Sequence, residues 1–131
     1  MAVGLNNHQG SLATEDPQLM QTVLYILKDK GYFFIDSFTS GETVGYELAT
    51  KLQVPTAKRT VFLDNKPDTT YIKQQLEELV EEALEKGEAI GIGHNKKLTL
   101  EVLKRYIPYY ERQGIRFGRI TEALEYPDVI L

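Results

Sequence analysis

Both histidines of the chain and two of its aspartates occupy equivalent places in the sequence. His8, Asp36, Asp64 and His94 each follow closely on a short apolar run. Successive members are separated by roughly 30 residues, about the length of one β/α unit. Because α/β folds place ligands and catalytic groups at the carboxyl ends of parallel strands, we expect a polar site there. An aspartate after a strand also commonly caps the next helix, and this remains the alternative for Asp64.

These residue types limit the chemistry of such a site. Histidines and carboxylates on neighbouring strands suit a divalent metal with a bound water. They equally suit a general acid and a general base on opposite sides of a scissile bond. In the second case we expect Asp36 to orient His94 and to favour its imidazolium form. The chain has no cysteine and no Gly-x-Ser-x-Gly elbow, so neither a thiol nor a serine nucleophile is expected.

The elements that must position these residues are predicted by the apolar pattern. Near-continuous apolar runs predict strands buried on both faces at residues 2–5, 32–35, 60–63 and 89–92, with a weaker fifth run at 115–117. Between them, capping residues and helical spacing predict helices over residues 16–31, 42–52, 68–87 and 99–114. This alternation predicts an α/β fold with a parallel sheet.

Two of these helices carry more specific predictions. Leu19, Val23, Ile26 and Leu27 share one face of the first helix, and we expect that face to contact the core. Pro108 lies inside the last helix and should kink or interrupt it. The acidic run of the third helix lies opposite its apolar face, so we interpret it as a solvated surface.

Composition excludes several classes of function. The 131 residues predict one domain, and a complete eight-fold barrel needs roughly 200–250 residues, so only about half a barrel fits. Fifteen basic and nineteen acidic residues give a net charge of −4, which argues against nucleic-acid binding. No apolar run approaches the ~18 residues of a membrane span. We recognise no export leader in this sequence.

Four motifs resemble those of the divergent polysaccharide deacetylases. They occur in the family's order and spacing, and the resemblance extends over nearly the entire chain, to about Leu124. The motifs are Asn6-Asn7-His8-Gln9-Gly10-Ser11, Phe33-Phe34-Ile35-Asp36-Ser37, Val61-Phe62-Leu63-Asp64-Asn65 and Ile90-Gly91-Ile92-Gly93-His94.

The resemblance implies half of a distorted (β/α) barrel of the glycoside hydrolase and deacetylase type. It implies metal-dependent hydrolysis of acetyl groups on a polysaccharide or N-acetylated sugar, in proteins that are typically exported or periplasmic. His8 is then a ligand of a divalent ion, often zinc, and His94 is the general acid with Asp36 as its partner. The residues implied at the substrate are Asn7, Ser11, Asp64 and Asn65.

The sequence also departs from the family pattern. A strand ending in paired aspartates and another ending in a further histidine are both missing, so the chain resembles the domain from about its fourth strand. One histidine is too few protein ligands for a catalytic metal. We therefore expect an incomplete ligand set and no activity from this chain alone. Phe38 stands where an arginine or a small residue is expected, and Gln9 where methionine is common.

Three interpretations remain open. The first is the C-terminal half of a deacetylase domain over residues 1–124, with an irregular tail at 125–131. The second is a non-catalytic carbohydrate-binding or assembly module of the same fold, and the third is an unrelated doubly wound domain. The strand edge from Ala2 to Leu5 should seek a partner, which predicts a homo-oligomer. Tyr106, Tyr109 and Tyr110 either stack on sugar or pack in the core, and their helical spacing favours packing.

Overall fold

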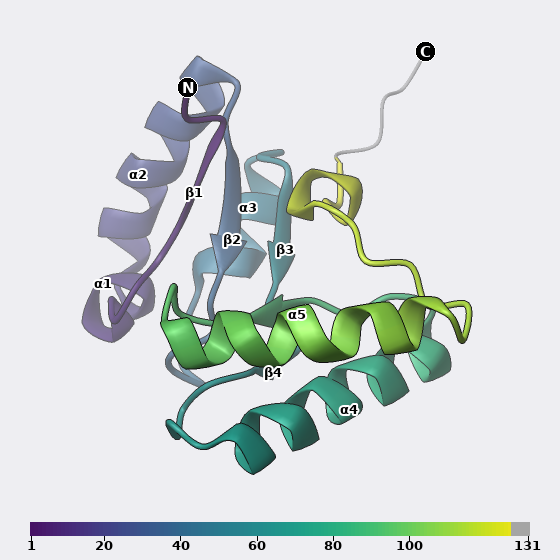
Figure 1. The fold of residues 1–131 in the computed structure, drawn as a ribbon. Coiled ribbons are helices and arrows are strands. Elements are labelled where there is room, and N and C mark those ends of the chain that lie inside the picture. The colour runs from purple at the N-terminus through teal and green to yellow at the C-terminus, as the bar shows by residue number, and fades with distance from the viewer. Residues whose placement is uncertain (127–131) are drawn as a thin grey trace. The chain divides into compact units, whose positions relative to one another are not determined.

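Parallel strands alternate with helices along the chain, as the sequence predicts, and they form two units (Figure 1). The computed structural model describes residues 1–126. Unit 1 contains Met1–Lys58 and the residues from Leu124 onward, and unit 2 contains Arg59–Ala123. The expected tail at 125–131 lies mostly outside the described residues, but Glu125 forms an antiparallel bridge with Thr56 in unit 1.

Unit 1 is a three-stranded parallel sheet with helices between its strands. The sheet has the order β1-β2-β3, and its register places Leu5 opposite Phe34 and Ile35 opposite Ala57. The elements are β1 (Gly4–Asn6), α1 (Ser11–Glu15), α2 (Pro17–Lys30), β2 (Phe33–Asp36), α3 (Gly45–Lys51) and β3 (Thr56–Lys58).

Helix α2 begins and ends where its capping residues predict. The Asp16 carboxylate accepts hydrogen bonds from the backbone N–H groups of Gln18 and Leu19, which have no partner inside the helix. Gly31 ends the helix with φ of 68°, a left-handed conformation that glycine adopts without steric cost. These local signals explain why the sequence predicts this helix to within a residue.

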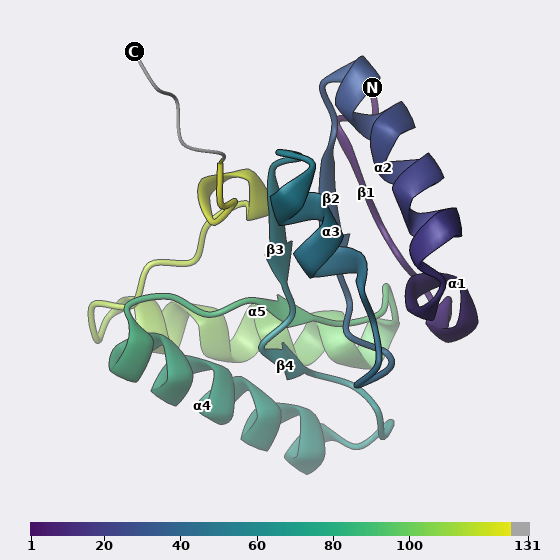
Figure 2. The same cartoon turned by 180° about the vertical axis from the view of Figure 1, so that it is seen from behind.

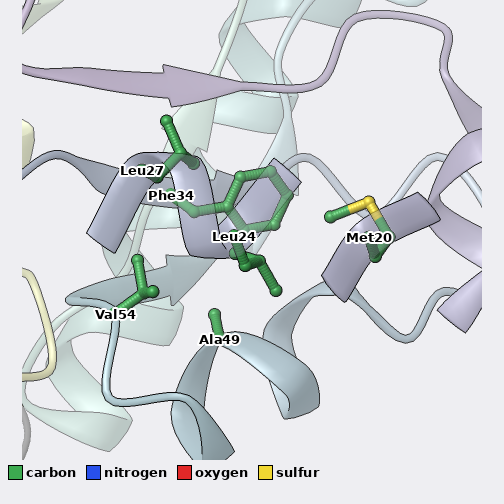
Figure 3. Packing of buried hydrophobic residues seen from close by; sticks show 6 residues of the cluster. All are labelled: Met20, Leu24, Leu27, Phe34, Ala49 and Val54. Atoms are coloured by element: carbon green, nitrogen blue, oxygen red, sulfur yellow. The ribbon is translucent and has the colours of Figure 1, made fainter. Parts of the chain in front are cut away.

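The core of unit 1 corrects the predicted inner face of α2. Leu27 is buried as expected, but Leu19 and Ile26 are exposed and Val23 is only half-buried. The residues that face β2 and α3 lie on the adjacent stripe of the helix (Figure 3). The helical period cannot choose between two neighbouring apolar stripes, because the packing partners decide which one is covered. The core consists of Met20, Leu24, Leu27, Phe34, Ala49 and Val54.

Unit 2 is a two-stranded parallel sheet with two long helices that pack together. Its strands β4 and β5 pair in register, with Val61 opposite Gly91 and Phe62 opposite Ile92. Asp68 caps α4 by accepting a hydrogen bond from the Thr70 backbone. The elements are β4 (Val61–Phe62), α4 (Thr69–Lys86), β5 (Gly91–Ile92), α5 (Lys97–Glu111) and a 3₁₀ turn, η1 (Ile120–Glu122).

One predicted strand is missing, and one observed strand was not predicted. Residues 115–117 form no strand, although Ile115 and Phe117 pack against the core of unit 2, which explains their apolar character. Strand β3 is not predicted, because Pro55 and Thr56 interrupt its apolar run. In the structure the Thr56 hydroxyl donates to the Phe34 carbonyl at 2.8 Å, so this polar residue is satisfied inside the sheet.

Helix α5 continues through Pro108, so of the predicted kink or interruption the structure excludes the interruption. Pro108 is exposed in the last turn of the helix, and its carbonyl accepts a hydrogen bond from the Arg112 backbone. The tyrosine spacing favours core packing of these side chains, and two of the three follow it. Tyr110 is buried in the core of unit 2 and Tyr106 packs against it, whereas Tyr109 is exposed. Over residues 1–126, no helix combines the length and apolar character required to cross a membrane.

A glycine at the start of α3 provides the first test. A Cβ added to Gly45 would lie 2.9 Å from the Phe34 ring and 3.0 Å from the Asp36 carboxylate. We expect Gly45→Ala to lower the free energy of unfolding by about 1–3 kcal/mol through overpacking. Gly41→Ala is the matched control, because a Cβ there meets nothing within 4 Å. Denaturant titration of both variants measures the difference, and equal losses would contradict this account.

Candidate functional site

The carboxyl ends of β4 and β5 bring together an aspartate and a histidine. Asp64 follows β4 and His94 follows β5, and the His94 Nδ1 lies 2.8 Å from the Asp64 Oδ1. The other carboxylate oxygen, Oδ2, accepts the His94 backbone N–H at 2.8 Å and the Thr99 hydroxyl at 2.7 Å. Because an ionised carboxylate only accepts hydrogen bonds, Nδ1 carries the proton. Asp64 therefore fixes both the position and the tautomer of the His94 ring.

Burial and hydrogen bonds shift the pKa of Asp64 in opposite directions. Its side chain is 2% exposed and that of His94 is 35% exposed. Burial raises the pKa of the Asp64 carboxyl, but the hydrogen bonds from Thr99 and from the ring and backbone of His94 outweigh it. The net pKa lies below its ordinary value. Asp64 is thus a stable anion beneath a partly exposed imidazole.

Three further residues shape this pair. The Phe62 ring lies 5.7 Å from the His94 ring between centroids, and the Arg59 guanidinium lies 5.3 Å from the centre of the Phe62 ring. A Cβ on Gly93 would come within 3.3 Å of the Thr99 methyl group, so glycine lets the chain pass close to Asp64. Thr99 was not predicted as part of the site. Thr99 is the third residue of α5, and a side chain in the first turn of a helix can reach the end of the preceding strand. This position could have indicated its role from the sequence.

Polar residues at the ends of β1 and β2 form a second network, within unit 1. The Asn7 side chain accepts the Ser37 backbone N–H at 2.8 Å and donates to the Thr39 hydroxyl at 3.3 Å. The Ser11 hydroxyl donates to the same Thr39 hydroxyl at 3.2 Å. Asn6 donates to the Ser37 hydroxyl at 3.2 Å. Two of the predicted substrate residues, Asn7 and Ser11, are therefore joined through Thr39.

Asp36 is engaged by donors within unit 1, whereas His94 is held in unit 2 by Asp64. The hydrogen bond of the His94 ring goes to Asp64, and the fully buried Asp36 accepts three donors within unit 1. Its oxygens accept the Phe38 backbone N–H at 2.9 Å, the Thr43 hydroxyl at 2.9 Å and the Tyr46 backbone N–H at 3.1 Å. Asp36 thus anchors the loop that leads into α3. Within unit 2 the structure shows Asp64 as the partner of His94 Nδ1, and a pairing of Asp36 with His94 stays a prediction.

The remaining predicted residues lie in exposed loops. His8 is exposed after β1, directly before Gln9, whose φ is 58°, and Asn65 is exposed between β4 and α4. Phe38, in the β2–α3 loop, also has a positive φ of 53°, which is uncommon for an aromatic residue. Its ring lies 5.7 Å from the Lys58 ammonium. This strain is stored in a loop that the sequence associates with function, which is typical of functional sites.

The described residues do not fit a catalytic metal site by themselves. Within residues 1–126, no three side chains of histidine, cysteine, aspartate or glutamate are arranged to hold an ion. A catalytic zinc site needs about three protein ligands. His8 stays a candidate ligand, but Asp36 and Asp64 are engaged by neighbouring donors.

The low pKa of Asp64 predicts how its contribution to stability depends on pH. A carboxyl whose pKa is lower in the folded than in the unfolded protein stabilises the fold above its unfolded value, ordinarily about 3.9. That contribution is lost as pH falls through the folded value. We expect Asp64→Asn to lose about 1–3 kcal/mol near neutral pH and to flatten the acid dependence. Glu78→Gln on the exposed face of α4 is the control, with thermal melts across pH as the measurement. An unchanged acid dependence in Asp64→Asn would contradict the assignment.

Comparisons with known proteins agree with this description. Over 103 residues the chain is 39% identical to an uncharacterized protein of Haemophilus influenzae, covering 79% of this chain and 37% of that protein. Over 128 residues it is 36% identical to the uncharacterized protein YibQ of Escherichia coli K12, covering 98% of this chain and 40% of YibQ. The chain therefore spans about two fifths of the length of these relatives.

A solved structure and a family model define the relationship further. The crystal structure of the uncharacterized protein ATU2773 from Agrobacterium tumefaciens C58 matches 92% of this chain and 49% of its own, with a TM-score of 0.89 at 19% identity. This match shows the α/β fold. The model of the divergent polysaccharide deacetylases matches residues 1–124. The chain belongs to the divergent polysaccharide deacetylase family.

Proposed function

We propose that this chain forms part of an enzyme that hydrolyses acetyl groups on carbohydrate, in which His94 is the general acid. The observation that carries the proposal is the 2.8 Å hydrogen bond between His94 Nδ1 and a buried, ionised Asp64. An amide is a difficult bond to cleave because its amine leaves poorly unless it is protonated. An imidazolium can supply that proton, and a positioned acid typically contributes about 10²–10⁴-fold to the rate.

The geometry assigns distinct roles to the two ring nitrogens. Nδ1 stays hydrogen-bonded to Asp64, so the proton transferred to the leaving nitrogen comes from Nε2. Asp64 stabilises the positive charge of the ring while it is protonated and keeps the ring in place after the proton leaves. Asp64 is thus a positioning residue, and His94 is the residue that meets the substrate.

The polar residues of the exposed loops support carbohydrate as the substrate class. Asn7, Ser11 and Asn65 offer amide and hydroxyl groups, which can both donate and accept hydrogen bonds as sugar hydroxyls do. Family membership suggests dependence on a divalent metal, and the resemblance of the motifs suggests zinc. Because the described residues do not assemble three ligands, no catalytic step is assigned to a metal here.

The missing ligand cluster favours a second candidate function. A non-catalytic carbohydrate-binding or assembly module of the same fold would keep polar loops without needing a complete metal site. The two functions differ in their ligands: a deacetylase distinguishes an acetylated sugar from the deacetylated one. NMR titration with oligomers of N-acetylglucosamine and of glucosamine makes this comparison, and equal responses to both would contradict the deacetylase proposal.

The role of His94 predicts the behaviour of a conservative variant. An asparagine can still donate to Asp64 but cannot act as an acid, so His94→Asn should keep the fold and lower kcat by about 10²–10⁴-fold. Because the chain alone is expected to be inactive, acetate release from N-acetylglucosamine oligomers is measured with zinc on the chain joined to a family segment that carries the missing ligand motifs, and Asn95→Ala in the same loop is the control. Release that survives His94→Asn contradicts the acid role. Binding without any release favours the module.

The ligand count predicts the result of a zinc titration. A site with fewer than three protein ligands holds zinc weakly, so calorimetry on the purified chain should detect no tight binding. His8→Ala tests the candidate ligand, and His94→Asn is the control for the other imidazole. Tight binding that His8→Ala abolishes would show that further ligands do assemble, and would contradict our reading of the described residues.

A further inference from the structure

Helix α2 carries a second apolar stripe that the core of unit 1 covers only in part. Leu19, Val23 and Ile26 recur at helical spacing beside the buried stripe. Leu19 is 45% exposed and Ile26 is 53% exposed, whereas Val23 between them is half-buried because it packs partly against the core. A stripe of this length on a helix surface is typical of an interaction site, because isolated apolar residues would not share one face.

The exposed edge of the sheet continues this stripe. In the described residues β1 pairs only with β2, so its other side presents unpaired backbone groups (Figure 2). Val3 and Leu5, which are 56% and 44% exposed, alternate along the strand and therefore share one face. The register places Leu5 beside Phe34, which packs in the core with α2. We call Val3, Leu5, Leu19, Val23 and Ile26 the α2–β1 face.

Charges of opposite sign lie at the two ends of the stripe. Asp16 precedes the helix and Lys30 ends it, and both are exposed. Helical spacing places both close to the line of Leu19, Val23 and Ile26. An antiparallel copy of the same helix would bring Lys30 of one chain to Asp16 of the other, and would also oppose the two helix dipoles favourably. The stripe is therefore complementary to itself.

We propose that the α2–β1 face binds a second copy of this chain about a two-fold axis near Val23. An axis at Val23 pairs Leu19 with the Ile26 region of the other helix, and Asp16 with Lys30. The same axis lets the two β1 edges pair antiparallel, so both sheets join into one. Strands lie about 4.8 Å apart and a crossover helix lies over the strands that it joins, so the two α2 helices would be separated by about 10 Å. That is the ordinary packing distance of helices.

Dilution of the purified full chain tests this proposal. Sedimentation equilibrium should show a species of twice 14.9 kDa that dissociates on dilution. Ile26→Lys places a charge in the centre of the face and should weaken the dimer about tenfold or more. Leu84→Lys is the matched control, because Leu84 is 70% exposed on α4 of unit 2. A monomer at every concentration overturns the proposal and assigns the face to a different polypeptide segment. A dimer weakened equally by both variants also overturns it.

Cross-linking tests the position of the axis without depending on a destabilising charge. The chain contains no cysteine, so a single introduced one can bond only with its copy. Val23→Cys lies next to the proposed axis and should form a covalent dimer under mild oxidation, because a disulfide requires Cα atoms within about 7 Å. Leu84→Cys should remain mainly monomeric. Equal cross-linking of the two variants, or none at Val23→Cys, overturns the arrangement.

Discussion

A carboxylate can be buried in a protein only where donors surround it, and each unit of this chain is organised about one such group. Asp36 is the last residue of β2 and Asp64 lies two residues after β4, and both are buried. Each accepts a backbone N–H from a loop and a threonine hydroxyl, from Thr43 and Thr99 respectively. The cost of an unpaired buried charge fixes the path of these loops. The hydrogen bonds to each carboxylate therefore tie a loop to the end of its strand.

The two carboxylates differ in their third donor. This difference gives Asp36 a structural role and Asp64 a role in the proposed reaction. The third donor to Asp36 is the Tyr46 backbone at the start of α3, so that carboxylate is fully committed to the fold. The third donor to Asp64 is the His94 ring, a group that can itself exchange a proton. Burial of Asp64 in unit 2 strengthens its interaction with the ring, because water does not screen it. The kind of buried carboxylate that anchors a loop in unit 1 therefore holds a proton-exchanging ring in unit 2.

The sequence predicts much of this fold, because its signals are local. Asp16 and Gly31 define α2, Asp68 defines α4, and the in-phase strand ends place His8, Asp36, Asp64 and His94 at loops. Pairing between loops is not local. The spacing shows that two aspartates and two histidines lie at equivalent strand ends. It does not show which aspartate forms a hydrogen bond with which histidine. The pairing of β4 with β5 decides it, since Asp64 and His94 follow adjacent strands. Strand β3 and the covered stripe of α2 depend in the same way on contacts between distant segments.

The general acid and the metal of the proposed reaction need different numbers of protein groups to hold them in place. An imidazole needs one carboxylate to hold it, and unit 2 provides that carboxylate within its own strands. A metal needs several ligands whose positions are fixed together, and the described residues do not bring three into one group. The chain spans about two fifths of its relatives in Haemophilus and Escherichia. A proton donor can therefore be complete within this chain, while a metal-dependent hydrolysis would need ligands from more polypeptide than residues 1–126 supply.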